Sequence, residues 1–366
     1  MKRSGPGSVV VAPVALANFA QAIFQALGAD QDVAAEVSKH LVRSDLSGHP
    51  SHGVLQIPRY VLSVRRGEVV PSARPDFVAR HDATALIDAH RGFGQFSTRF
   101  ALDWCLERAR ATGIAAAAIR HSVHVGRLGD YIERATEAGM VGIMSLGSVG
   151  AGGGNAAPFG GTGRFLGTNP WSMGIPARDA QPLVFDAATT VVAEGKVRLA
   201  RAEGRSAPKE SIVDAQGNAS VNPEDYYAGG WLRLLGGESA GHKGYGLSLA
   251  AALIGALCMI EDPAPTSGDG TSEVDGRVGG VFLIAIDPGS FGSPVAYQKM
   301  VAATLKASKL MPRAPGVDEI FIPGEVVARA RRDGQRTGIG IPPGTWEDLQ
   351  ESGRDLGVPS PATVPG

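Results

Sequence analysis

Four side chains that could take part in chemistry, a hydroxyl, an imidazole, a guanidinium and a phenol, fall within the segment from Ser51 to Tyr60, together with a glycine. The imidazole of His52 is the group whose unperturbed pKa, roughly 6.5, suits proton transfer near neutral pH. The glycine directly after it allows a backbone geometry, or a close approach of a ligand, that a side chain would obstruct. The residue types therefore predict acid–base chemistry on a small polar substrate, centred on Ser51 and His52.

A second histidine, His124, stands between a predicted strand and a predicted helix, where side chains tend to face a cleft. Both a catalytic and a structural role fit this position. The other histidines form no spaced set with nearby carboxylates, and neither H-E-x-x-H nor a paired C-x-x-C is present. The sequence therefore predicts no metal site.

A glycine-rich segment, 239–247, runs straight into a strongly apolar helical pattern and contains His242 and Lys243. The N-terminus of a helix presents free main-chain N–H groups and a positive dipole end, which suit a phosphate, and Lys243 adds a cation. One hypothesis is a contact with the phosphates of a dinucleotide. The other is a glycine-rich turn with a solvated lysine.

Asp186 ends a short predicted strand and is followed by small residues and by the hydroxyls of Thr189 and Thr190. A carboxylate at this place can accept a hydrogen bond from a ribose or an amide, or it can cap the next helix. The dinucleotide fingerprint G-x-G-x-x-G is missing, as are the Walker loop and the G-x-S-x-G motif. A nicotinamide cofactor would therefore have to bind on a fold other than the Rossmann fold.

The elements that must position these residues alternate between helix and strand, which predicts a mixed α and β, α+β-like class. Predicted helices cover residues 15–27, 32–44, 95–112, 128–138, 190–202, 247–260 and 294–310. Predicted strands cover residues 84–88, 115–119, 141–145, 183–186 and 281–286. Residues 203–239 are expected to have little regular structure, 266–278 to form a loop, and the last dozen residues to be disordered.

The composition, 43% hydrophobic and 19% charged over 366 residues, is that of a globular chain with one large or two ordinary cores. Its 35 basic and 36 acidic residues are interspersed, so no nucleic-acid partner is expected. Cys105 and Cys258 fall in apolar helical patterns and fit buried thiols of a reducing compartment. The most apolar helical pattern, 247–260, is shorter than the roughly 20 residues that a membrane span needs. We expect a cytoplasmic protein without a membrane partner.

Taken in order, the motifs of this chain resemble those of the type 2 malate/L-lactate dehydrogenase family, from about Ala15 to Leu349. That family also includes ureidoglycolate and sulfolactate dehydrogenases, diketogulonate reductase, and reductases of piperideine-2-carboxylate and pyrroline-2-carboxylate. The matching segments are Ser51-His52-Gly53, Pro58-Arg59-Tyr60, His124-Val125-Gly126, Pro158-Phe159-Gly160-Gly161, Leu166-Gly167-Thr168-Asn169-Pro170, Asp186-Ala187-Ala188-Thr189-Thr190, Glu194-Gly195-Lys196, His242-Lys243-Gly244-Tyr245-Gly246-Leu247, Gly279-Gly280-Val281-Phe282 and Pro323-Gly324-Glu325.

The resemblance implies an oxidoreductase that uses NAD or NADP on a non-Rossmann mixed fold and forms a homodimer. It implies that His52 is the proton donor to the substrate and that His124 lies in the active site. The cofactor-binding residues that it implies are Val184, Asp186, Ala188, Thr189, Thr190, His242, Lys243, Gly324 and Glu325. We expect an N-terminal helical portion with the Ser-His-Gly segment over 1–75, a mixed cofactor- and substrate-binding portion over 76–320, and a C-terminal segment that packs back over 321–366.

The chain departs from the family pattern at three places. Several members carry an arginine four residues after the active-site histidine, where this chain has Gln56. Val123 stands where an asparagine is usual, and the glycine-rich stretch 147–155 lacks a lysine that some members have. Binding of a substrate carboxylate, for which an arginine is well suited, must therefore come from elsewhere, or the substrate differs.

The resemblance and the residues together predict hydride transfer between a nicotinamide and C2 of a small 2-hydroxy or 2-oxo acid. His52 would exchange the proton, Ser51 would position it, and Gln56 and Tyr60 would face the substrate, with His124 as a second candidate for the proton role. Two alternatives stay open. The chain could reduce a cyclic 2-imino acid, or it could be a homologue that binds the nucleotide without turnover.

Overall fold

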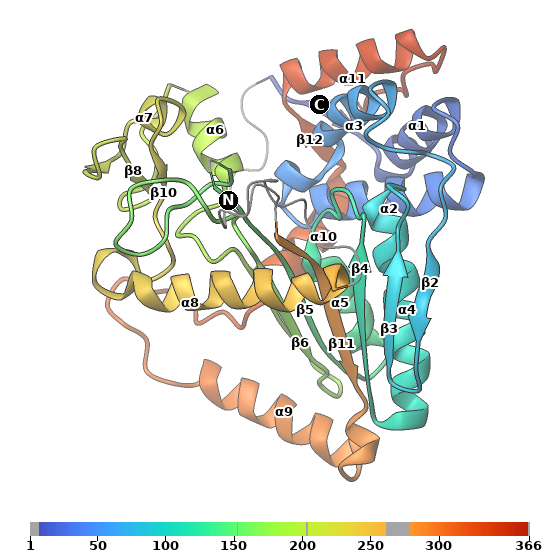
Figure 1. Ribbon diagram of the computed structural model, residues 1–366, viewed down its shortest axis with the longest axis vertical. Helices are drawn as coiled ribbons and strands as arrows, with labels where there is room; N and C mark the ends of the chain where they lie inside the picture. The colour runs from blue at the N-terminus through green and yellow to red at the C-terminus, as the bar shows by residue number, and fades with distance from the viewer. Residues whose placement is uncertain (1–6, 152, 203, 261–277, 365–366) are drawn as a thin grey trace, which may run out of the picture.

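A mixed seven-stranded sheet forms the centre of the protein in the computed structural model, which describes residues 7–151, 153–202, 204–260 and 278–364 (Figure 1). The strand order is β2-β3-β4-β11-β5-β6-β7. These strands are β2 Asp76–Arg80, β3 Thr84–Asp88, β4 Ile114–Arg120, β5 Val141–Val149, β6 Trp171–Ile175, β7 Leu183–Ala187 and β11 Val278–Ile286. Among the described strands, β3 and β4 pair in parallel, while the other neighbours in this sheet are antiparallel.

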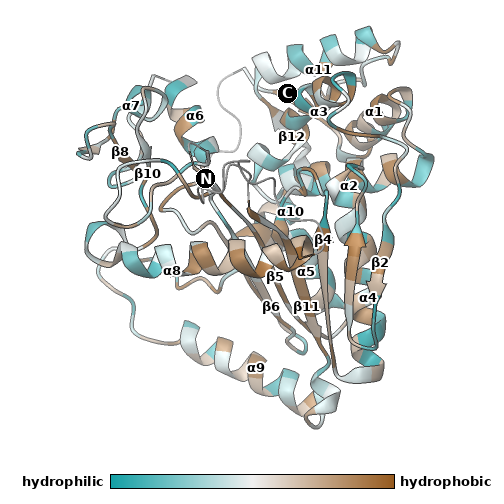
Figure 2. Cartoon of the chain, in the orientation of Figure 1, coloured by the Kyte–Doolittle hydropathy of each residue, from teal (hydrophilic) through white to brown (hydrophobic). Residues whose placement is uncertain are grey.

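Helices cover both faces of this sheet. On one face, α4 (Gly94–Thr112) and α5 (Leu128–Glu137) pack on the strands, and α8 (Gly237–Gly255) crosses the other face, in front of β5 and β11 in Figure 1. Figure 2 shows the apolar residues concentrated along these strands and along α8. Gly147 of β5 permits the close approach of α8, because a Cβ atom there would lie 2.3 Å from the main-chain nitrogen of Ala252.

The N-terminal helices and the C-terminal segment share one hydrophobic core. The N-terminal elements are β1 Val9–Val11, α1 Pro13–Ala26, α2 Gln31–Leu46, the 3-10 turns η1 Pro50–His52 and η2 Val54–Gln56, and α3 Ile57–Arg65. The C-terminal ones are α10 Glu325–Thr337, β12 Ile339–Ile341 and α11 Pro343–Asp355. β1 pairs with β12, and Trp346 and Leu349 of α11 join the core of Phe19 and Ile23.

The last dozen residues were expected to be disordered. In the structure, the end of the chain pairs with β1 as far as Val364. The main-chain N–H of Val364 donates to the carbonyl oxygen of Val10 at 2.8 Å, and Thr363 bridges to Val11. The prediction failed because the partner of this segment is β1, at the other end of the sequence. Residues 365 and 366 lie outside the described part.

The stretch after β7 contains the predicted helix α6 (Glu194–Ala202), and beyond it residues 204–239 are more regular than predicted. The stretch also contains α7 Pro223–Tyr227 and a three-stranded sheet in the order β10-β8-β9, where β8 is Ile212–Val213, β9 is Ala219–Ser220 and β10 is Trp231–Leu232. Val197, Ile212, Tyr226 and Leu232 form part of its own small core. Strands of two residues are too short to show a period of two, so the sequence pattern did not reveal them.

Most longer elements match the prediction closely. β3 coincides with the predicted strand 84–88, and α9 (Pro294–Lys309) with the helix predicted over 294–310. The apolar helix begins earlier than predicted, at Gly237, and ends in the 3-10 turn η3 (Ala256–Met259), while η4 (Pro288–Ser290) precedes α9. α6 begins at Glu194 because Thr190, predicted as its first residue, bridges to Leu234 instead.

Both cysteines are buried free thiols, as predicted. No described helix combines the length and the hydropathy needed to cross a membrane. The predicted loop 266–278 lies outside the described residues except for Val278, which begins β11.

Candidate active site

Two histidines from different parts of the chain stack on each other. His52 ends η1, and His124 lies in the loop that follows β4. Their ring centroids are 5.8 Å apart and their planes are inclined by 15°. The fold therefore brings together the two histidines that the sequence singled out.

The ring of His124 is held by a buried pair of polar side chains. The Tyr60 hydroxyl lies 2.6 Å from Nδ1 of His124, and the Gln95 amide donates to that hydroxyl at 2.7 Å. Because the amide N–H can only donate, and these are the hydroxyl's two partners among the described residues, the hydroxyl proton goes to Nδ1. Burial raises the pKa of Tyr60 well above its ordinary value, which keeps the phenol protonated. The neutral ring of His124 then carries its hydrogen on Nε2.

The ring of His52 has one partner, the hydroxyl of Ser51, which lies 3.1 Å from Nδ1. Among the described residues, Nε2 of His52 has no hydrogen-bond partner. Burial, aided by the charges of His49 and Arg59 among others, lowers the pKa of His52 to about 4. Burial likewise lowers the pKa of His124 to about 3. Both rings are therefore neutral at neutral pH.

Gln56 and Tyr60, predicted to face the substrate, both hold other parts of the site in place. The amide nitrogen of Gln56 donates to the carbonyl oxygen of Ser51 at 2.6 Å. The side chain of Gln56 is buried, as is Tyr60 behind His124. Their contacts with the substrate stay predictions.

Asp186 caps a helix, but a different one from the helix that follows it in sequence. Its Oδ2 accepts from the main-chain N–H of Gly129, in the first turn of α5, at 2.8 Å. A second neighbour is Arg127, whose guanidinium nitrogen lies 4.0 Å away. Burial raises the pKa of Asp186 above its ordinary value, against the opposing charge of Arg127.

The segments predicted to bind the cofactor lie next to one another. The N–H of Val184 donates to Pro323 at 3.0 Å, and Gly324, with φ of +98°, packs against Val184. Just beyond the end of β7, the N–H of Leu235 donates to the carbonyl oxygen of Thr189 at 2.8 Å. Gly244, in the first turns of α8, fits closely against Leu235. Val184, Asp186, Ala188, Thr189, His242, Lys243 and Gly324 thus belong to one continuous region.

Several of these side chains already have partners within the protein. The hydroxyl of Thr189 donates to Thr168 and that of Thr190 to Val192, at 2.9 and 2.7 Å. The carboxylate of Glu325 pairs with Lys309 at 2.7 Å and accepts from the N–H of Ile322. By contrast, His242 and Lys243 are exposed, just after the kink of α8 at Ala240.

Comparison with known proteins shows the family to which the chain belongs. Residues 11–350 match the family described as malate/L-lactate dehydrogenase. The chain belongs to this family. Its predicted mixed fold and its predicted class, an oxidoreductase, are confirmed with it.

The curated and structural relatives of this dehydrogenase family cover almost the whole chain. It is 33% identical to hydroxycarboxylate dehydrogenase B of Escherichia coli K12 over 351 residues, 94% of this chain and 93% of that protein. It is 31% identical to a Δ1-pyrroline-2-carboxylate reductase of Ancylobacter novellus, over 90% of this chain and 93% of that one. Malate dehydrogenase from Entamoeba histolytica superposes with a TM-score of 0.88 at 26% identity, covering 97% of this chain and 100% of its own.

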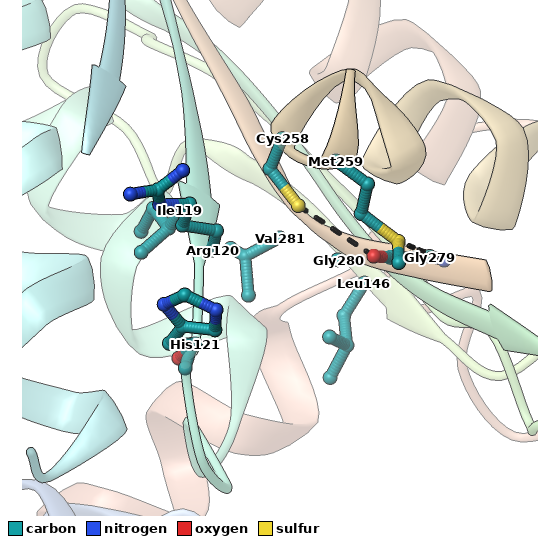
Figure 3. Close-up of a pocket in the computed structure, with 10 residues that line it drawn as sticks. Ile119, Arg120, His121, Leu146, Cys258, Met259, Gly279, Gly280 and Val281 are labelled. Atoms are coloured by element: carbon teal, nitrogen blue, oxygen red, sulfur yellow. Dashed lines mark hydrogen bonds between the residues drawn. The ribbon is translucent and has the colours of Figure 1, made fainter. Parts of the chain in front are cut away.

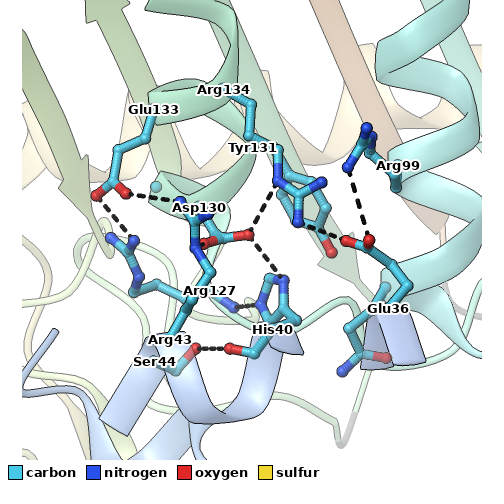
Figure 4. Close-up of polar contacts among 12 residues, drawn as sticks. Glu36, His40, Arg43, Ser44, Arg99, Arg127, Asp130, Tyr131, Glu133 and Arg134 are labelled. Carbon is cyan, nitrogen blue, oxygen red and sulfur yellow. Dashed lines mark hydrogen bonds and ion pairs between the residues drawn. The ribbon is translucent and has the colours of Figure 1, made fainter. Parts of the chain in front are cut away.

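Figure 4 shows a network of ion pairs around the buried carboxylates of Asp130 and Glu133 in this member of the family. Asp130 lies 2.6 Å from Arg43 and 3.4 Å from both His40 and Arg134. Glu133 pairs with Arg127 at 2.8 Å and with Arg331 at 2.5 Å. These charges hold the pKa of Asp130 well below its ordinary value despite its burial. The network joins α2, α5 and α10 beneath the site.

Sequence analysis predicted no site role for Gln95 or Arg127, and it named Gly195 as part of a matching segment without giving it a role. Gln95 is one of several buried polar residues of α4, and Arg127 is one of many arginines. Gly195, at the start of α6, touches the site directly, because a Cβ there would lie 2.9 Å from Cβ of Ser51. These contacts depend on the meeting of elements far apart in sequence, which no local pattern encodes.

A separate cavity of about 160 Å³ lies between β4, β5, β11 and η3 (Figure 3). Arg120, His121, Cys258 and Met259 are among the residues that line it. None of the residues predicted for catalysis or for cofactor binding lines it. Among the described residues, no group of three or more histidine, cysteine or acidic side chains is arranged to hold a metal ion.

Proposed function

We propose that this chain is a dehydrogenase that interconverts a small 2-hydroxy acid and the corresponding 2-oxo acid with NAD or NADP. The observation that carries the proposal is the pair of neutral, stacked imidazoles, each held at Nδ1 and each without a partner at Nε2 among the described residues. A bound nicotinamide supplies the hydride exchange at its C4 atom. The protein has to supply proton transfer, orientation and charge.

The two rings are prepared for complementary roles. His124 carries its hydrogen on Nε2 and donates it to the oxygen on C2 of the substrate. We assign the hydrogen of His52 to Nδ1, from which it is donated to Ser51. The lone pair at Nε2 is then free to take the proton of the 2-hydroxyl group. In the direction of reduction the protonated His52 returns this proton, and the negative charge of the bound carboxylate stabilises the imidazolium. If the roles are exchanged, His124 is the proton carrier.

Arg59 is the cation that we propose to bind the substrate carboxylate, in the absence of an arginine at position 56. It is exposed and forms no hydrogen bond or ion pair with the described residues. It lies on α3, next to Tyr60 and one helical turn after Gln56. Its charge contributes to the lowered pKa of both His52 and His124, which places it within electrostatic reach of both rings.

The test of Arg59 is its replacement by glutamine. We expect Arg59→Gln to raise KM for the acid by about 10- to 100-fold, the effect of losing a charged hydrogen bond, and to leave KM for the cofactor unchanged. Arg65→Gln is the matched control, because Arg65 lies on the same helix and pairs with Asp355 at the surface. Equal effects of the two substitutions would remove Arg59 from the site.

The nicotinamide dinucleotide is proposed to lie along the region from Gly324 through β7 to the start of α8. The kink at Ala240 makes Gly241, His242 and Lys243 the first turn of the longer part of α8. We propose that the N–H groups of this turn are available to a ligand, as is usual for the first turn of a helix. An exposed lysine and free N–H groups fit a pyrophosphate. We propose that Val184, Asp186, Ala188, Thr189, Thr190 and Gly324 line this region and that the ion-paired Glu325 fixes its end.

We further propose that the enzyme is a cytoplasmic homodimer. Leu247, Leu253, Leu257 and Ile260 are exposed on and just after α8, whose ribbon is brown along part of its length in Figure 2. Exposed apolar patches of this kind are typical of protein interfaces. Sedimentation equilibrium with Leu253→Glu tests the dimer, and a monomeric wild-type protein would contradict it.

The proposed function is tested with a panel of 2-oxo acids and cyclic 2-imino acids, each with NADH and NADPH. Oxidation of the cofactor by a 2-oxo acid supports the proposal and identifies the cofactor. Turnover of cyclic imines alone favours an imine reductase, for which the low pKa of His52 is an argument, because an iminium brings its own proton to the reaction. Tight cofactor binding without turnover of any compound would show a nucleotide-binding homologue.

A further inference from the structure

A carboxylate lies directly beneath the turn that carries His52. Asp45 belongs to the last turn of α2, and its side chain packs against Gly53. A Cβ atom on residue 53 would lie 2.1 Å from Oδ1 of Asp45 and 2.4 Å from Oδ2. The backbone of Gly53 has φ of −94°, which other residues adopt readily. The glycine is therefore required by the space that Asp45 occupies and not by conformation.

The same carboxylate bonds to the main chain just beyond His52. Oδ2 of Asp45 accepts from the N–H of Val54 at 2.8 Å. Among the described residues this is its one hydrogen bond, and no cation pairs with it. Burial raises the pKa of Asp45 to about 7. A buried carboxyl group without a cation partner lowers the stability of the fold. Asp130 and Glu133, in the network nearby, have arginine partners instead.

The turn is thus held at two points, one on each side of His52. The amide of Gln56 holds the carbonyl of Ser51, and Asp45 holds the N–H of Val54. Between them, the direction of the imidazole depends on the position of the main chain at residue 53. A shift of this main chain would separate the ring of His52 from that of His124.

We propose that Asp45 is a positioning residue of the active site: its carboxylate, seated against Gly53 and bonded to Val54, holds the imidazole of His52 in its stacked position on His124. The assignment of a reaction to His52 rests on the proposed function. The position of the ring can be measured independently of any reaction.

The test is a double-mutant cycle between Asp45 and Gly53. Asp45→Ala removes the support, and we expect it to lower kcat by up to about 100-fold, the usual cost of a misplacement near 1 Å, with cofactor affinity unchanged. Gly53→Ala introduces a methyl group into the carboxylate and should lower kcat similarly. In the double variant the methyl group has room, so the combined loss should be clearly smaller than the product of the two.

Asp45→Asn separates positioning from a general loss of structure. It keeps an acceptor oxygen for Val54 and the volume of the side chain, so kcat should return to within a few-fold of the wild type. If Asp45→Ala does not fold, Asp45→Asn and Gly53→Ala still test the proposal. Asp348→Ala and Gly344→Ala, both on the exposed side of α11, are the matched controls.

The ring itself is followed by NMR of the histidine side chains. We expect Asp45→Ala and Gly53→Ala to shift the resonances of His52 and to leave those of His90, a surface histidine, in place. Unchanged His52 resonances, or losses of kcat that multiply in the double variant, would overturn the proposal. If instead His52→Asn proves fully active while the resonances shift as expected, the proposed function fails and the positioning of the ring by Asp45 stands.

Discussion

His40 and the pair His52 and His124 lie in neighbouring parts of the molecule but in opposite surroundings: His40 is completely buried, whereas His52 and His124 are half-buried. Nε2 of His40 accepts from the N–H of Arg127 at 2.9 Å, and its Nδ1 faces Asp130 at 3.4 Å. Both nitrogens of His40 therefore have partners in the protein. His52 and His124 each have a partner at Nδ1 and none among the described residues at Nε2.

The electrostatic surroundings differ in the same way. Around His40, each carboxylate has at least one arginine partner, as for Asp130 with Arg43 and Glu133 with Arg127. Around the stacked pair, no described carboxylate pairs with either ring, and burial lowers the pKa of both. A histidine with two partners stabilises the fold, whereas one with a free nitrogen and a lowered pKa is available for chemistry.

The largest effect expected from this comparison is the loss of activity in His52→Asn. Removal of a general acid–base group should lower kcat by about 10² to 10⁴-fold and leave cofactor affinity unchanged. His40→Asn should act mainly on stability, because it breaks contacts to α5. Steady-state kinetics and urea unfolding of both variants check the contrast. A near-normal kcat in His52→Asn would remove His52 from the mechanism.

A second prediction concerns Asp130, the centre of the ion-pair network. Asp130→Ala leaves Arg43, Arg134 and His40 without their shared carboxylate, and we expect the free energy of unfolding to fall by about 3 to 5 kcal/mol. Asp103→Ala, which breaks an exposed pair with Arg99 on α4, is the control and should cost less than about 1 kcal/mol. Similar losses of unfolding free energy in the two variants would show that the network stabilises the fold no more than an exposed ion pair does.

The pH dependence of stability sharpens the contrast further. The folded pKa of His52, about 4, lies below its ordinary value of 6.5, so the unfolded state binds the extra proton between these values. The stability due to neutral His52 is therefore complete above about pH 6.5 and falls as the pH drops towards 4, by at most about 3 kcal/mol. His52→Asn should flatten this fall.

Asp45 changes the pH dependence of stability in the opposite direction. The effect of His52 is therefore measured as the difference between the wild type and His52→Asn. The folded pKa of Asp45, about 7, lies above its ordinary value of 3.8. Its contribution to stability is complete at low pH and is lost as the pH rises towards 7. Urea unfolding at several pH values, for the wild type and for His52→Asn, gives the difference. Parallel curves would contradict the lowered pKa of His52.

The smallest effect is expected for Tyr60→Phe. It removes the hydroxyl between Gln95 and His124, so the tautomer of His124 is no longer set, and kcat should fall by about 2- to 10-fold, the range of one neutral hydrogen bond. Tyr297→Phe on α9 is the control. If kcat is unchanged in Tyr60→Phe, His124 does not act through its Nε2 hydrogen.

Local sequence patterns predicted much of the fold. Helical periodicity located α4 and α9 almost to the residue, and the runs of β-branched and small apolar residues located β3, β4 and β11. The patterns missed α3, α10 and α11, as well as the small sheet of β8, β9 and β10. Short elements carry too few residues for a period, and amphipathic helices such as α10 are defined by the surface on which they pack.

By itself, the sequence determined the class of fold and the family and indicated the two histidines of the candidate site, because these depend on residue types and on motifs in a fixed order. Only the tertiary structure decided what each buried polar group does. It paired His40 and stacked His52 on His124, turned Tyr60 and Gln56 into supports, and set Asp186 at the start of α5. The close packing of Asp45 against Gly53 was likewise decided by the tertiary structure. Distances between side chains from separate elements arise when the elements pack, so no local pattern contains them.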